Sequence, residues 1–265
     1  MLWPALSLAW WNADWTGRKK IELDTSPQGA GISAAVSNAP VLIRLHTGNF
    51  AFAEAQLDGN DLRFVAEDDK TPLKYHIESF DATNELALIW VQVPSLQGGA
   101  VSTFWMYYGN DKAPAAGDAK STYDSSYLAV VHFSEKDAAY KDSTAYSAQI
   151  ATTGVVASGA GVADGAAAFN GSAKLVFPSA PAMKTGPAGF TFSAWVKPDS
   201  PKGVILSHYE DYFEGQGHGN GRNALGRAAV RRLPSAPSKR RTAVRRGRRR
   251  RMSLTLEFLG TGDAF

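Results

Sequence analysis

The sequence LALIWVQVPSLQGGAVSTFWMYY at residues 86–108 decides the fold class. Its two ends, residues 86–93 and 101–108, are apolar at nearly every position, as expected of strands that are covered on both faces. Between them, PSLQGG at residues 94–99 supplies turn residues. The pattern therefore predicts two central strands joined by a short connection.

The segments around this pair carry strand signals and few helix signals. VLIRLH at residues 41–46 alternates apolar and polar side chains, which is typical of a strand with one face in water. Residues 49–57 alone show helical spacing, and Asn49 is placed to cap that helix. One short helix does not change the class, so we expect an all-β protein built as an antiparallel β-sandwich.

A second β segment follows a small, polar stretch at residues 114–121, which we interpret as a linker. The strands expected after it lie at residues 127–133, 168–169, 174–177, 190–196 and 203–207. The stretch around residues 150–171 is rich in Ala, Gly and Ser, and we expect it to be mostly loop.

Composition bounds the class of protein. A chain of 265 residues with 44% apolar residues allows one or two domains with a substantial core. The absence of cysteine excludes disulfides, thiolate metal sites and a cysteine nucleophile. No apolar run reaches the ~18 residues that a membrane span requires.

The net charge of +3 conceals a division of the chain near Gly221. Up to that glycine there are 15 basic and 23 acidic residues, and Lys outnumbers Arg. Residues 222–251 carry 13 basic residues, 12 of them Arg, and no acid. Because a natural basic tail usually mixes Lys with Arg, we interpret residues 213–251 as a Gly/Arg-rich disordered tail produced by a change of reading frame.

The first nine residues, MLWPALSLA, resemble the end of a secretory signal peptide. Ser7 and Ala9 occupy the small-residue positions that a signal peptidase needs, although a basic start and a full apolar stretch are missing. We therefore expect residues 1–9 to be a signal-peptide remnant and the protein to be periplasmic or otherwise extracytoplasmic.

Several motifs in the first 110 residues occur in a fixed order. They are WWNADW at 10–15, RKKI at 18–21, DLRF at 61–64, ESFD at 78–81, WVQVP at 90–94 and YYGN at 107–110. With its W-W-x-x-x-W-x-x-R-K opening, this series resembles a bacterial domain-of-unknown-function family found at the N-termini of secreted and envelope proteins.

The following motifs, VHF at 131–133, AAFNG at 167–171 and FTFSAWV at 190–196, resemble the first half of a laminin-G or concanavalin-like jelly roll. The pairing resembles the N-terminal region of some TolQ/ExbB/MotA-type proton-channel proteins, which implies a cell-envelope setting. Half a jelly roll leaves apolar faces and strand edges open to water, so we expect the second domain to be poorly stable. Residues 252–265 resemble the first strand of metallo-β-lactamase-fold hydrolases.

We accordingly expect a sandwich domain of unknown function at residues 10–120 and a partial laminin-G/concanavalin-like domain at 121–212. The disordered tail occupies residues 213–251, and a short fragment at 252–265 follows it. The whole chain is then a truncated piece of a larger envelope protein.

The candidate ligand-binding residues belong to the first domain. Tryptophans can stack on the apolar faces of sugar rings, or they can plug the end of the sandwich. An arginine near carboxylates forms either a binding site or a structural pair. On this basis the candidates are Trp10, Trp11, Trp15, Asp61, Arg63 and Glu78.

The sequence predicts no catalytic residue, metal site or cofactor. The five histidines are scattered and lack zinc-site spacing. Glu210, Asp211 and Glu214 could serve glycoside hydrolysis, but the Glu-x-Asp-x-Glu strand pattern of concanavalin-like glycosidases is absent.

We therefore expect a non-catalytic module that binds a glycan or an envelope protein, with no specific nucleic-acid partner. Two alternatives remain open: a carbohydrate-active hydrolase, and a protein that binds nucleic acid non-specifically through the arginine tract.

Overall fold

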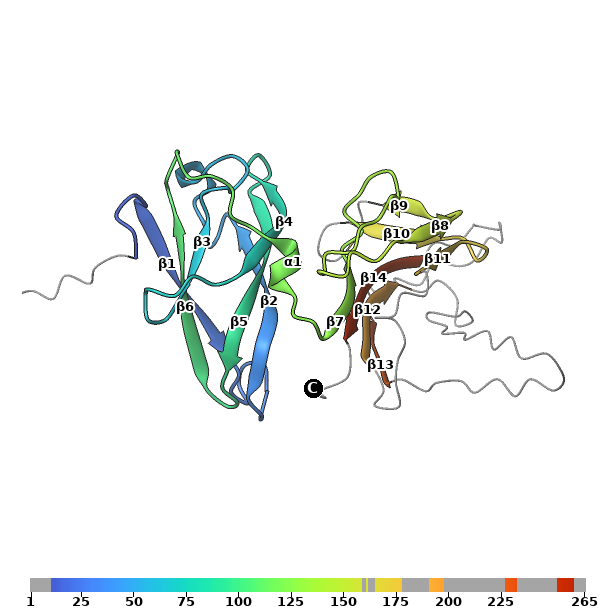
Figure 1. Cartoon of the computed structure of the whole chain (residues 1–265), viewed down its shortest axis with the longest axis horizontal. Coiled ribbons are helices and arrows are strands. Elements are labelled where there is room, and N and C mark those ends of the chain that lie inside the picture. Colours follow the sequence, from blue (N-terminus) through green and yellow to red (C-terminus); the bar gives the residue numbers. More distant parts are fainter. Residues whose placement is uncertain are drawn as a thin grey trace, which may run out of the picture. The chain divides into compact units, whose positions relative to one another are not determined.

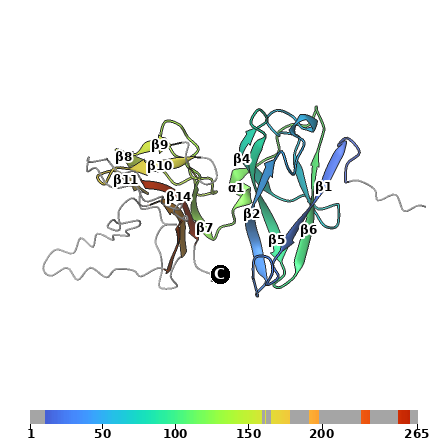
Figure 2. The same cartoon turned by 180° about the vertical axis from the view of Figure 1, so that it is seen from behind.

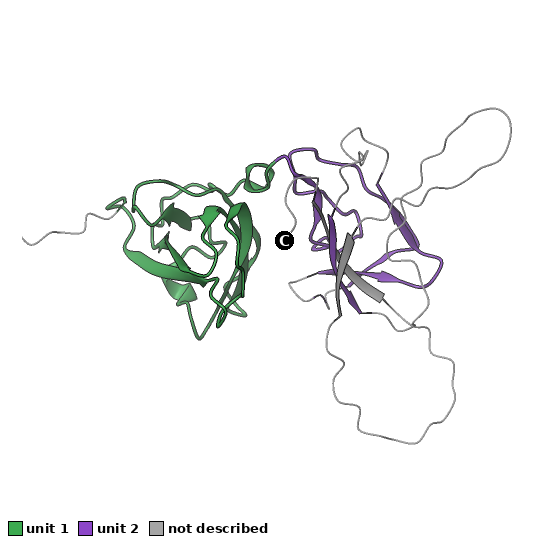
Figure 3. Cartoon of the chain, turned by 90° about the horizontal axis from the view of Figure 1, so that it is seen from below, with its two compact units in different colours: residues 1–124 green, residues 125–265 purple. Residues whose placement is uncertain are grey.

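The computed structural model describes residues 11–158, 161, 165–177, 191–197, 227–232 and 252–259. The chain divides into two compact units, Met1–Asp124 and Ser125–Phe265 (Figure 3). Each unit is built from β-strands, so the predicted all-β class is confirmed.

The first unit contains two antiparallel three-stranded sheets, shown in Figures 1 and 2. One sheet has the order β1 (Gly17–Asp24), β6 (Val101–Tyr108), β3 (Arg63–Ala66), and the other β2 (Val36–His46), β5 (Leu86–Leu96), β4 (Tyr75–Asp81). The two apolar segments at residues 86–93 and 101–108 therefore form β5 and β6, the central strands of the two sheets, as predicted.

The core of this unit lies between the two sheets. Ile89 and Val91 of β5 are fully buried, as are Phe104 and Met106 of β6, and they share one cluster with Phe64 of β3. Alternate residues of each strand point to opposite faces, so the intervening side chains lie on the outer faces of the sandwich.

The helix predicted at residues 49–57 is wrong. Only Phe52–Glu54 forms a single 3-10 turn, η1. Asn49 does not cap it; its side chain accepts from His46 N at 2.8 Å and donates to the Arg44 carbonyl at 3.0 Å, closing the turn after β2. Phe50 and Phe52 are both buried at a spacing of two residues, which a helix cannot place on one face.

A short helix, α1 (Ala119–Thr122), closes the first unit. Asp118 caps it by accepting from Lys120 N and Ser121 N, at 3.0 and 3.3 Å. The predicted linker thus ends in an ordered turn that is tied to β4, because Asp118 N donates to the Tyr75 carbonyl at 2.7 Å.

The second unit has a sheet of six described strands and a separate two-stranded ribbon. The sheet contains β7 (Tyr127–Val131), β9 (Val156–Ser158), β10 (Ala166–Phe169), β12 (Thr191–Lys197), β13 (Arg227–Arg232) and β14 (Met252–Leu259), and the ribbon contains β8 (Ala151–Thr153) and β11 (Lys174–Val176).

Three features of this unit differ from the sequence expectation. The Ala/Gly/Ser-rich stretch contains β8 and β9, which were expected to be loop and are joined through Gly154 at φ +64°, in addition to β10, which overlaps the strand expected at residues 168–169. Part of the segment expected to be disordered forms β13, whose backbone adds in parallel to β12. Strand β14 lies inside the sheet, between β12 on one side and β7 and β10 on the other.

Several predictions fall outside the described residues. They concern the signal-peptide remnant at 1–9, Trp10, the strand at 203–207, the carboxylates Glu210, Asp211 and Glu214, and most of the arginine tract.

Candidate functional site

The outer face of the β1–β6–β3 sheet carries an unusual concentration of aromatic and cationic side chains. Register places Arg18 of β1 and Arg63 of β3 on either side of Tyr107, and Lys20 and Val65 on either side of Trp105. The neighbouring residues Phe104 and Met106 point into the core, so this second set faces outward. We call Trp11, Trp15, Arg18, Arg63, Trp105 and Tyr107 the aromatic–cationic face.

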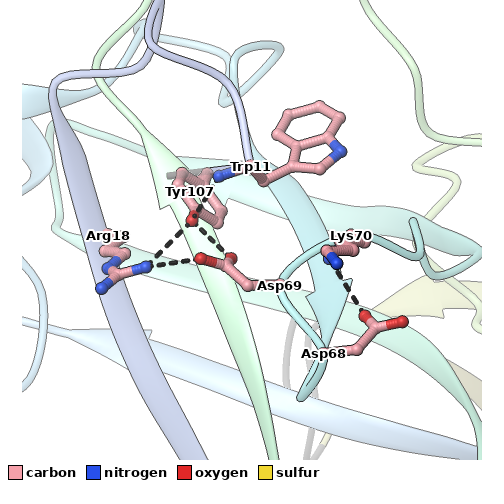
Figure 4. Close-up of polar contacts among 6 residues, drawn as sticks. All are labelled: Trp11, Arg18, Asp68, Asp69, Lys70 and Tyr107. Atoms are coloured by element: carbon pink, nitrogen blue, oxygen red, sulfur yellow. Dashed lines mark hydrogen bonds and ion pairs between the residues drawn. The ribbon is translucent and has the colours of Figure 1, made fainter. Parts of the chain in front are cut away.

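A hydrogen-bonded triad lies on this face (Figure 4). Arg18 Nη1 lies 2.7 Å from Asp69 Oδ2 and donates to the Tyr107 hydroxyl at 3.2 Å, while that hydroxyl donates to Asp69 Oδ1 at 2.5 Å. Trp11 N donates to the same hydroxyl at 3.0 Å. Tyr107, which is fully buried, thus links the N-terminal segment, β1 and the loop after β3.

The triad also fixes the charge and direction of Arg18. Its guanidinium carbon lies 4.3 Å from the centre of the Trp105 ring, a cation–π contact. Hydrogen bonding to Tyr107, with the charge of Asp69, raises the pKa of Arg18. Burial, followed by the hydrogen bond to Asp69, raises the pKa of Tyr107. Both groups therefore keep their protonated forms at neutral pH.

Trp11 and Trp15, from the WWNADW motif, cover the middle of this face. Trp15 is buried with Val65, Tyr107 and Ala113, and its Nε1 donates to the Asp61 carbonyl at 2.6 Å. The Trp11 ring is half-buried, with its centre 5.2 Å from that of Trp15. Trp15 thus plugs the structure, whereas Trp11 keeps part of its ring exposed.

Asp61 is a fully buried carboxylate that organises the chain beside this face. Its Oδ1 accepts from Gln56 N at 2.9 Å, and its Oδ2 accepts from Gly109 N at 2.6 Å and Asn110 N at 3.3 Å. The motifs at residues 61–64 and 107–110 therefore meet in space. Their shared role is to hold the segment after β6 in place.

Arg63 and Gly109 also help to hold the segment after β6 in place. Arg63 donates to the carbonyls of Asn60, Leu62 and Pro114 at 2.8, 2.7 and 2.6 Å, and its guanidinium lies 5.2 Å from the Trp15 ring. The sequence suggested that Arg63 pairs with a carboxylate. In the structure it donates instead to these backbone carbonyl groups. Gly109 has φ +83°, and a Cβ there would clash with Thr16 Oγ1.

Glu78 lies apart from the other candidates. It belongs to β4 of the opposite sheet, at a register shift between Ile77 and Ser79, and its Oε2 accepts from Trp90 Nε1 at 2.6 Å. Trp90 lies between two core residues of β5 and therefore points to the outer face of that sheet. The structure thus unites Trp11, Trp15, Asp61 and Arg63 but not Glu78.

Sequence reasoning missed four residues of this region: Arg18, Asp69, Trp105 and Tyr107. Arg18, Trp105 and Tyr107 stand within quoted motifs, and period-two alternation along residues 101–108 places Trp105 and Tyr107 on one face. Only the pairing of β1 with β6 adds Arg18 to that face. Asp69 follows β3 in a polar loop, and no local pattern marks it as the partner of Arg18, 51 residues earlier.

The charged groups of this region are engaged within the fold. Arg18 and Asp69 neutralise each other, and Asp61 is saturated by backbone donors. Within the described residues, no three His, Asp or Glu side chains lie close enough together to hold a metal ion. In that same part of the chain, no helix is long and apolar enough to cross a bilayer.

Comparison with known proteins supports a coarse classification. A family model described as Domain of unknown function (DUF2341) matches residues 58–148, from the turn before β3 to the region after β7. The match supports the predicted likeness to a domain-of-unknown-function family. No curated protein and no solved structure matches the chain. The chain is thus an all-β protein with a segment similar to that family.

Proposed function

We propose that this chain is a non-catalytic, extracytoplasmic module that binds a glycan or a partner protein through the aromatic–cationic face. The observation that carries the proposal is the fixed position of Arg18 above Trp105, together with the half-exposed Trp11, whose ring packs against Tyr107, the hydrogen-bond partner of Arg18. Tryptophan, tyrosine and arginine dominate the binding energy of protein interfaces, and tryptophan also stacks on sugars.

Preorganisation strengthens this argument. Because Asp69 and Tyr107 already hold the Arg18 guanidinium, a ligand that contacts it does not have to order a long, flexible side chain. Trp11 is likewise tied through its backbone N–H to Tyr107. A binding surface with these properties loses little conformational entropy on association.

The setting is part of the same proposal. The leader-like pattern of residues 1–9 and the resemblance to the N-terminal region of proton-channel proteins support a place in the cell envelope. The laminin-G or concanavalin likeness of the second unit rests on its sequence motifs and points to the same class of recognition module.

The test is binding of the full chain to immobilised glycans and to solubilised envelope proteins. We expect Trp11→Ala and Arg18→Ala each to weaken binding at least tenfold, as for interface residues of central importance. Trp195→Ala is the matched control, because Trp195 is a partly exposed tryptophan of the second unit. Wild-type affinity in both variants, or no binding to either class, would contradict the proposal. Release of reducing sugar ends would contradict the non-catalytic assignment.

A further inference from the structure

Strand β1 is an edge strand of the described β1–β6–β3 sheet. Among the described strands it pairs with β6 alone, over the full length Gly17–Asp24, and Figures 1 and 2 show it at the rim of the first unit. An unpaired edge presents N–H and C=O groups that another strand can use. The free edge ends at Asp24, whose carbonyl oxygen accepts from Ala30 N at 2.8 Å.

The charges along this edge are separated by sign. Arg18 and Lys20 come before Ile21, and Glu22 and Asp24 come after it. These four charged residues have the same parity, so their side chains lie on one face of the sheet, whereas the fifth charged residue of β1, Lys19, lies on the other face and falls opposite Leu23 in the pairing argued below. Lys20, Glu22 and Asp24 are exposed. Hydrogen bonds from the Ser26 side chain and N–H lower the pKa of Asp24, which therefore carries its charge at neutral pH.

We propose that β1 pairs with the β1 strand of a second copy of this chain, antiparallel about a two-fold axis at Ile21. Lys20 then lies opposite Glu22 of the other copy, and Arg18 opposite its Asp24, so that every directly opposed pair of charges is attractive. Such a contact is isologous, since each copy uses the same strand. The two three-stranded sheets become one continuous sheet, with the aromatic–cationic faces of both copies on the same side.

The charge order also selects this register over its neighbours. Moving the axis to Lys20 brings two Lys20 ammonium groups together, and moving it to Glu22 brings two carboxylates together. A shift by one residue would set outward side chains against inward ones. Lysines alone on an edge only discourage pairing. In β1 the lysine is followed by Glu22 and Asp24, so an antiparallel second copy sets acids opposite basic residues and pairing is favoured.

Existing contacts identify the pair that matters most. Arg18 is engaged by Asp69 at 2.7 Å, which limits what its charge can add at the edge. Lys20 and Glu22 pair within one strand at 2.8 Å, but both side chains are about half exposed, at 48% and 58%. They can therefore exchange partners at low cost, since exposed ion pairs contribute little.

The test is a charge exchange in the full chain, followed by sedimentation velocity over a range of concentrations. Wild-type protein should dimerise reversibly. Lys20→Glu and Glu22→Lys should each weaken dimerisation about tenfold or more, because each replaces two attractive pairs by two repulsive ones. The double variant, Lys20→Glu with Glu22→Lys, should restore it. Glu67→Lys, an exposed charge reversal outside β1, is the matched control.

A second measurement locates the contact without relying on the dimerisation constant. The chain has no cysteine, so Lys20→Cys and Glu22→Cys introduce unique thiols. A mixture of these two variants should be joined by a short thiol crosslinker faster than either variant alone. A monomeric wild type at all concentrations would overturn the proposal. So would a dimer that is insensitive to both single charge reversals, or equal crosslinking in all three samples.

Discussion

Asp61 shows how one buried carboxylate can serve structure in a motif that looks functional. Its oxygens accept backbone N–H groups from the turn before β3 and from the chain after β6. A carboxylate that is satisfied in this way has little capacity left for a ligand. The sequence motif drew attention to Asp61 as a candidate ligand-binding residue. In the structure its role is to hold the motifs at residues 61–64 and 107–110 together.

We expect Asp61→Ala to lower the free energy of unfolding of the first unit by about 3 kcal/mol or more, because it leaves buried N–H groups without an acceptor. Asp61→Asn keeps one acceptor oxygen and should have a smaller effect. The exposed Asp58, whose Oδ1 accepts from Asn60 N, is the control, and Asp58→Ala should change stability by about 0.5 kcal/mol or less. Urea unfolding measures all three variants. Equal effects of Asp61→Ala and Asp58→Ala would contradict this account.

At the scale of elements, the sequence predicted best those strands that are central in their sheets. Strands β5 and β6 read as uninterrupted apolar runs because each is central in its sheet. Strands β8 and β9 have three residues each, rich in small or hydroxylated side chains, and such short strands give no periodic signal. The helix predicted at residues 49–57 does not form because tertiary packing overrides its local spacing. Phe50 packs edge-on against both Phe52 and Tyr108, with ring centres 5.1 Å apart in each case.

The candidate site could be predicted only in part for a similar reason. Trp11, Trp15, Asp61 and Arg63 stand in motifs that attract notice, and the fold brings them together. Glu78 stands in an equally conspicuous motif, yet it lies on the opposite sheet. Which sheet a strand joins depends on long-range pairing, and spacing along the chain does not encode that choice.

The turns of the first unit predict a dependence of stability on pH. Hydrogen bonds from the Asn84 side chain and backbone lower the pKa of Asp81 in the turn between β4 and β5. Those from the Thr71 side chain and backbone likewise lower the pKa of Asp68 after β3. A folded pKa below the unfolded one gives stability that is complete above the ordinary aspartate pKa of about 3.9 and is lost as pH falls through the folded value.

The urea midpoint of the wild type should therefore fall as pH is lowered below about 4. Asp81→Asn removes one titrating group and should flatten that part of the profile. Asn84→Ala keeps the carboxylate but removes the main cause of its lowered pKa, so it should flatten the same region. Because both carboxylates are exposed, we expect only small changes in the urea midpoint. Two variant profiles parallel to that of the wild type would contradict the assignment.

At the scale of the whole molecule, the two units have separate core clusters. The first unit buries a large cluster between its sheets, to which Phe104 and Ile89 belong. The described cluster of the second unit is smaller and includes Phe133, Phe192 and Val196. We expect the second unit to be the less stable one, because the half jelly roll that its sequence motifs indicate leaves apolar faces and strand edges open to water.

We accordingly expect two transitions when the full chain is unfolded in urea, with the second unit unfolding first. Phe192→Ala should move only the transition at lower urea concentration, and Phe104→Ala only the one at higher concentration. Each change removes a fully buried aromatic ring, at a cost of about 3–5 kcal/mol to its own unit. Circular dichroism follows both units, and the two variants serve as controls for each other. A single transition that both variants shift together would show that the units unfold as one cooperative body.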